Sequence, residues 1–139
     1  MTYALAWPLQ EALFGLLTTD SGCVEALGGR VFDGTLPLKD ADAEGAYLVI
    51  GDEIARDGST KTEDGAVHVV RMDLYAPRRG FGDAKRAAAA VSDAVLEGHI
   101  PISRGSVVNA RFVDAETERD QNDALRRIRL RFRITLEDS

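Results

Sequence analysis

Residues 125–137, LRRIRLRFRITLE, carry the most regular pattern in the chain. Apolar and positively charged side chains alternate along this stretch, and a period of two indicates a β-strand with one face on a core. The apolar positions are Ile128, Leu130, Phe132, Ile134 and Leu136, and the alternating arginines are Arg127, Arg129, Arg131 and Arg133. A shift by one residue would turn four guanidinium groups into the core, so we expect the register of this strand to be firm.

Three other stretches predict further strands. Residues 47–50 form a short apolar run, residues 67–76 alternate between apolar and polar side chains, and residues 107–113 do so more weakly. The segments between them are polar and rich in turn formers. We expect a surface loop at residues 33–45, a long hairpin arm at 51–65 and a polar turn at 115–124.

Helical spacing marks the first third of the chain and the segment before residue 98. Apolar residues recur every three or four positions between Trp7 and Thr19, a short second helix fits residues 23–27, and Asp83 can cap an alanine-rich helix that Gly98 ends. These elements predict an α+β fold, in which an antiparallel sheet of about four strands carries two main helices on one face.

Length and composition predict a single domain spanning residues 1–139. The chain is 45% hydrophobic and 29% charged, as in ordinary globular proteins, and no apolar run approaches the roughly 18–20 residues of a membrane span. Its net charge of -6 has the wrong sign for a protein that neutralises many phosphates. The charge is uneven, because residues 1–64 contain 12 acidic and 4 basic side chains and residues 65–139 contain 11 and 13. Since no basic leader precedes the first apolar stretch, we expect synthesis in the cytoplasm.

The residues that could carry catalysis or bind a metal are few. Cys23 lies in an apolar helical pattern, His68 on the core-facing side of a strand and His99 beside a helix end, so we expect structural roles for all three. One thiol and two histidines cannot form a four-ligand zinc site, and we expect no cofactor and no catalytic residue. Asp40, Asp42 and Glu44 lack the spacing of a calcium loop.

The arginine ladder admits three explanations, because four like charges on one strand face repel one another unless acids or phosphates lie nearby. The arginines can pair within the sheet, they can face a neighbouring subunit, or they can touch the phosphates of passing DNA. The candidate partners within the chain are Asp73, Asp114, Glu116 and Glu118.

Several stretches together resemble one protein family. They are TYALAWPLQEALFGLLTTD at residues 2–20, GGRVFD at 28–33, AYLVIGDEIARDGSTKTEDGAVHVVRMDLYA at 46–76, ARFVDAETERD at 110–120 and the final strand. The chain resembles the small tail-completion proteins of phages and gene transfer agents, which are assigned to tail terminators. The similarity spans almost the whole sequence.

This resemblance implies a structural protein of the particle rather than an enzyme. Such proteins form a ring, usually a hexamer, that caps the tail tube at the head-tail junction and docks it to the neck or head-completion (stopper) protein, while DNA passes through the lumen. In that setting we expect the mobile arm at about residues 52–64 to contact a neighbouring subunit or the tube. Its candidate residues are Asp52, Glu53, Ile54, Arg56, Asp57, Lys61 and Asp64, and the arginine ladder is the candidate interface or lumen face.

Two other functions fit the same sequence. A head-completion stopper is also a small ring-forming neck protein, and the sequence contains no indication of axial position. A small ligand-binding domain or enzyme would instead use a cleft near Arg78, Arg79 and His99, where a turn leads into a helix N-terminus.

Overall fold

The computed structural model describes residues 3–34, 45–77, 81–119 and 125–138. Most of the expected loop at 33–45, including Asp40, Asp42 and Glu44, lies outside them. The elements are α1 (Ala6–Thr19), α2 (Ser21–Leu27), β1 (Val31–Asp33), β2 (Tyr47–Asp57), β3 (Asp64–Pro77), α3 (Gly82–Glu97), β4 (Ser106–Arg119) and β5 (Leu125–Asp138). The predicted α+β class is confirmed.

The sheet has five strands in the order β1-β2-β3-β5-β4, rather than the four that the sequence predicts. The additional strand, β1, pairs in parallel with residues 48–50 of β2, so the sheet is mixed, although its other pairs are antiparallel. A strand of three residues is too short to show an alternating pattern, so the sequence did not predict β1.

Two strands extend beyond their predicted ends. β2 continues from residue 50 to Asp57 through a β-bulge, and β4 continues through Ala115–Arg119, where we had expected a polar turn. The start of β4 packs Val107 and Ala110 against the core, whereas residues 115–119 at its end are exposed and need no apolar side chains. Its polar half is held by pairing with β5, and burial contributes little there.

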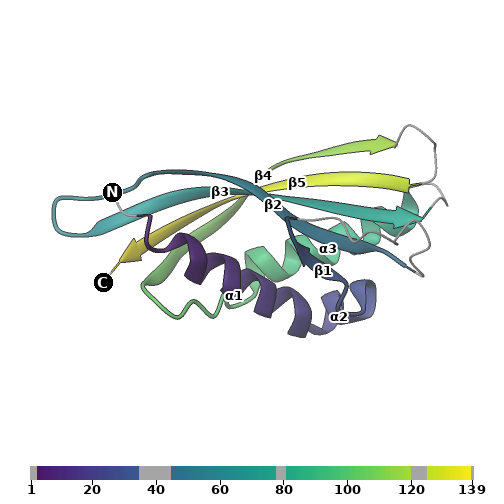
Figure 1. Cartoon of the computed structure of the whole chain (residues 1–139), viewed down its shortest axis with the longest axis horizontal. Helices are drawn as coiled ribbons and strands as arrows, with labels where there is room; N and C mark the ends of the chain where they lie inside the picture. The colour runs from purple at the N-terminus through teal and green to yellow at the C-terminus, as the bar shows by residue number, and fades with distance from the viewer. Residues whose placement is uncertain (1–2, 35–44, 78–80, 120–124, 139) are drawn as a thin grey trace.

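All three helices lie on one side of the sheet, and the other side is open (Figure 1). α1 packs near β1 and β2, whereas α3 lies under β3, β5 and β4. The Asp20 carboxylate caps α2 by accepting from the Cys23 N–H at 3.1 Å, and α2 ends at Gly28, whose φ of 58° suits glycine. The alanine stripe of α3 is buried, as its spacing predicts.

The core forms between this helix layer and the inner face of the sheet. The five apolar positions of the β5 pattern are all buried in it, whereas Arg133 is exposed on the open face. Phe132 is fully buried opposite Val70 of β3 and Phe112 of β4. Among the described helices, none is long and apolar enough to cross a membrane.

Truncating Phe132 tests the central place of β5. Phe132→Ala should lower the free energy of unfolding by about 3–5 kcal/mol, because a fully buried aromatic ring leaves a cavity. Urea unfolding of the purified chain measures this change. The matched control is Arg133→Ala on the same strand, which should stay within about 0.5 kcal/mol of the parent. Equal effects of the two substitutions would contradict the assignment of the two faces.

Candidate interaction surfaces

The expected arm is an extended β-hairpin made by the outer halves of β2 and β3. Asp52, Glu53, Ile54, Arg56 and Asp57 lie on β2, Lys61 lies in the connecting turn, and Asp64 begins β3. The Ser59 hydroxyl lies 2.6 Å from Asp57 Oδ1 and 2.8 Å from Asp64 Oδ1. These hydrogen bonds hold the pKa of both carboxyls below the ordinary value, so the base of the turn remains negatively charged.

One arm residue points into the protein rather than toward solvent. Glu53 Oε1 accepts from the Tyr3 hydroxyl at 2.9 Å, and Glu53 Oε2 accepts from His68 Nδ1 at 2.9 Å. The His68 side chain is 0% exposed, which confirms its predicted position on the core face, and its Nε2 has no hydrogen-bond partner among the described residues. The hydrogen bond from His68 is the main reason that the pKa of Glu53 is lowered. Glu53 therefore ties the hairpin to the N-terminal segment.

Three of the four ladder arginines pair within the sheet. Arg129 Nε lies 2.9 Å from Asp73 Oδ1, and Arg131 makes a two-pronged contact with Asp114 at 2.8 and 2.9 Å. The partner of Arg127 is Glu118. The neighbouring carboxylates raise the pKa of Arg129 and Arg131. Intramolecular pairing thus explains most of the ladder.

The fourth arginine has a different environment. Arg133 lies opposite Arg111 of β4 and Val69 of β3, and no acidic side chain among the described residues pairs with either arginine. Like charges placed directly opposite each other are unfavourable. The charge of the open sheet face therefore changes along the strands. At the end of β4 the arginines are paired with acids. Near the hairpin, two arginines have no acidic partner among the described residues.

Among the residues considered for chemistry, Cys23 occupies a structural position. Cys23 is buried, and its Sγ–H donates to the Ala90 carbonyl at 3.5 Å. Burial raises the pKa of the Cys23 thiol to about 12, so the reactive thiolate is scarce at neutral pH. His99 is exposed just after α3. Arg78 and Arg79 lie outside the described residues.

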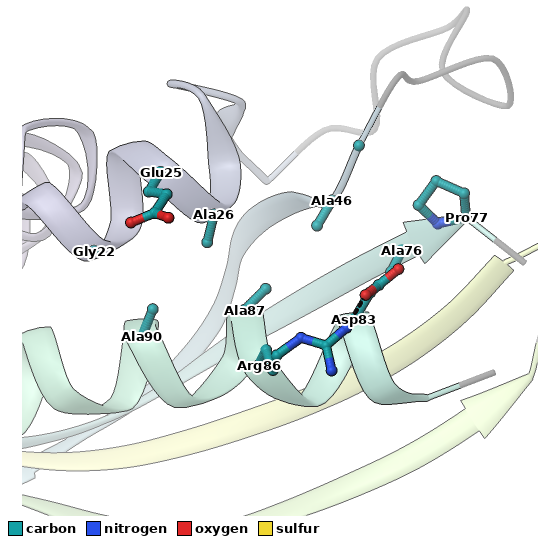
Figure 2. A pocket seen from close by; sticks show the side chains of 11 residues that line it. Gly22, Glu25, Ala26, Ala46, Ala76, Pro77, Asp83, Arg86, Ala87 and Ala90 are labelled. Carbon is teal, nitrogen blue, oxygen red and sulfur yellow. Dashed lines mark hydrogen bonds and ion pairs between the residues drawn. The ribbon is translucent and has the colours of Figure 1, made fainter. Parts of the chain in front are cut away.

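A hollow in the described surface is lined mainly by small side chains. It encloses about 660 Å³ between α2, α3 and the end of β3 (Figure 2). The charged side chains on its described lining are Glu25, Asp83 and Arg86, and Asp83 pairs with Arg86. Within the described part of the chain, no group of three or more His, Cys, Asp or Glu could hold a metal ion. Alanine and glycine walls provide little for the polar recognition of a small molecule.

Sequence reasoning missed two aromatic residues on the solvent face of α1. Trp7 and Phe14 are 63% and 43% exposed, and they lie on one side of the helix because they are seven residues apart. The helical pattern did place Leu9, Leu13 and Leu16 on the buried side. The sequence does contain a signal for them, because two aromatic residues lie on the helix face that is expected to be polar.

Changing Glu53 tests the tie between the hairpin and the core. Glu53→Ala should reduce the free energy of unfolding at neutral pH by about 1–3 kcal/mol, because buried His68 loses its partner. Glu53→Gln should lose less, since an amide oxygen still accepts from Nδ1. In the parent chain, ionised Glu53 stabilises the fold above its ordinary pKa of 4.5, and this contribution is lost as the pH falls through the lowered pKa.

Urea unfolding from neutral pH to about pH 3 measures both effects. Stability of the Gln variant should fall less in acid than that of the parent. Parallel pH profiles for the parent and the Gln variant would show that Glu53 is not responsible for the acid dependence.

Comparison with known proteins places this fold in a family. The family model described as tail completion protein gp17 matches residues 11–137. A chain from the structure "Virion of native gene transfer agent (GTA) particle" is 37% identical, covers 98% of this chain and 99% of its own length, and superposes with a TM-score of 0.85. The gp17 protein of bacteriophage SPP1 is 19% identical over 96% of each chain with a TM-score of 0.53, and this likeness supports the fold alone. No curated protein matches the chain. The chain therefore belongs to the tail completion protein gp17 family.

Proposed function

We propose that this protein completes the tail of a phage-like or gene-transfer-agent particle by forming a ring at the head-tail junction. The ring contains about six copies, ends the tail tube, joins it to the neck protein and surrounds the path of the DNA. Its role is structural rather than enzymatic, as membership of a tail-completion family suggests.

The observation that carries this proposal is the match to a chain of a native gene-transfer-agent virion. The two chains are 37% identical, and the match covers 98% of this chain and 99% of the relative. The relative therefore has no further domain outside the match. A small protein with this fold is therefore a component of one such particle, and we assign the same position to this chain.

The distribution of surface charge supports contact with other proteins and with DNA. Arg111 and Arg133 lie on the open face of the sheet. Neither has an acidic partner among the described residues. We propose that these two arginines meet phosphates in the lumen or acids on a neighbouring subunit, whereas Arg127, Arg129 and Arg131 already have partners in the chain. The hairpin extends beyond the helix layer (Figure 1), where it can reach a neighbour or the tube.

Imaging particles from cells that lack the gene tests this function. Loss of a tail terminator should give overlong tails or tails not joined to heads. Tails of normal length together with heads that leak DNA would identify a stopper instead, and normal particles would rule out both roles.

Shortening the hairpin tests its part in assembly. Deleting residues 56–62 should leave a folded chain, because the removed segment lies outside the core, but tails should no longer be completed. Circular dichroism and thermal unfolding check the fold, and electron microscopy of complemented knockout cells checks the tails. The control, Lys85→Ala, changes an exposed residue of α3 outside the hairpin and should behave as the parent. Normal tails with the shortened hairpin would remove the arm from the interface.

A further inference from the structure

A shallow recess lies where the start of α1 meets β1 and the base of the hairpin (Figure 1). Its volume is about 250 Å³. Two aromatic rings on its rim lie mostly in solvent, since Tyr3 and Trp7 are 64% and 63% exposed. Two carboxylates and two further α1 side chains complete the lining: Asp33, Glu53, Ala6 and Gln10. We call this surface the α1 recess.

The fold holds the rim of the α1 recess in place. The Tyr3 hydroxyl donates to Glu53 Oε1 at 2.9 Å, and the Tyr3 ring stacks on buried His68 with the ring centroids 6.3 Å apart. On the other side, Gln10 Nε2 donates to Asp33 Oδ1 at 2.5 Å. These contacts organise the rim in the free chain, and a preorganised site loses less conformational entropy on binding.

Both carboxylates keep the capacity to accept further hydrogen bonds. A carboxylate offers about four lone-pair positions. Among the described residues, Gln10 donates to Asp33, whereas Tyr3 and His68 donate to Glu53. The Glu53 side chain is still 22% exposed, and the hydrogen bond from His68 lowers its pKa, so Glu53 is ionised at neutral pH. No lysine or arginine of the described chain lines the recess to balance this charge.

Aromatic rings beside carboxylates favour a cation as the ligand. A cation is attracted to the face of an aromatic ring as well as to the carboxylates. An anion would be repelled, and an apolar group would remove both carboxylates from water without a partner, which costs free energy. A guanidinium suits both parts of the α1 recess, because its planar fork bonds carboxylates while its face stacks on a ring. An ammonium has no planar face to stack.

The size of the recess indicates that the cation belongs to a larger partner. Pockets that enclose small molecules measure roughly 300–1,000 Å³, so a free ligand would remain partly in water here. A protein surface would also cover exposed Phe14, which lies two helical turns beyond Trp7 on the same side of α1. The chain has a net charge of -6, and α1 contains no basic side chain. The complementary partner is therefore a separate protein with a basic surface.

We propose that the α1 recess binds an arginine side chain on the surface of a separate partner protein. The guanidinium stacks on Trp7 and donates to Asp33 and Glu53. Tryptophan and tyrosine are enriched among the residues that dominate protein-protein binding, as expected for a site built on Trp7 and Tyr3. The site does not depend on where the chain lies in a particle, so it goes beyond the proposed tail-completing role.

The fluorescence of Trp7 tests the cation site directly, because Trp7 is the only tryptophan in the sequence. The purified chain is titrated at constant ionic strength with N-acetyl-arginine amide, with the lysine equivalent and with the citrulline equivalent. Citrulline has a neutral urea group in place of the guanidinium. The arginine probe should give a saturable change and the lysine probe a weaker one, whereas the citrulline probe should give none.

A carboxylate variant with a matched control extends this titration. Asp33→Asn should weaken binding of the arginine probe about tenfold, because it removes a charge-assisted hydrogen bond. Glu25→Gln removes one charge from an exposed residue of α2, beyond the far end of α1, and should leave the affinity unchanged. Circular dichroism checks the fold of both variants. No saturable response, an equal response to citrulline, or unchanged affinity in Asp33→Asn would overturn the site.

Photo-cross-linking in particles tests the source of the arginine. A benzoylphenylalanine in place of exposed Glu11 lies on the same side of α1 as Trp7 and leaves both carboxylates of the recess intact. Particles from complemented knockout cells are irradiated, and the cross-linked peptides are sequenced by mass spectrometry. The captured peptide should belong to another protein and contain an arginine, and changing that arginine to glutamine should abolish the cross-link.

The other outcomes separate this proposal from the proposed function. A captured peptide from this same chain would show that a second copy covers the recess, and it would overturn the assignment of a separate partner. A partner peptide without an arginine, or particles that contain the chain but give no cross-link, would overturn it as well. If the chain is absent from the particles, the proposed function fails, and the fluorescence titration still decides the arginine site.

Discussion

The two-sided pairing of β5 is the constraint on which the rest of the fold depends. β5 lies between β3 and β4 and pairs with both along nearly its whole length. Its apolar face completes the core, and its other face aligns arginines with acids on the adjacent strands. A slip of one residue would bury guanidinium groups and separate them from these acids, so both faces favour the same register. The helices then have one surface on which to pack.

The alternating and helical patterns were enough to predict the main elements. The inner face of β5, the core position of His68 and the alanine stripe of α3 each follow from spacing, because burial on one side imposes a strict period. β1 and the last five residues of β4 could not be predicted in this way. β1 has three residues, too few to show a period although Val31 is buried, and the end of β4 is exposed and is held by pairing with β5.

The candidate surfaces could be predicted only in part. The acids that neutralise Arg129 and Arg131 were among those the sequence suggested, since cross-strand pairing of opposite charges is expected on an open face. The inward turn of Glu53 could not be foreseen, because it follows a β-bulge that shifts the register between Ile50 and Glu53. The position of Arg111 opposite Arg133 likewise depends on strand order, which no local pattern encodes.

The inner face of the sheet stabilises the subunit. We propose that the hairpin and the arginines near Val69 contact other molecules. Electron microscopy of particles that contain this protein, with its structure fitted at the head-tail junction, tests the proposed role most directly. We expect a single ring of this chain between the tail tube and the neck. A junction built without this chain would contradict the assignment.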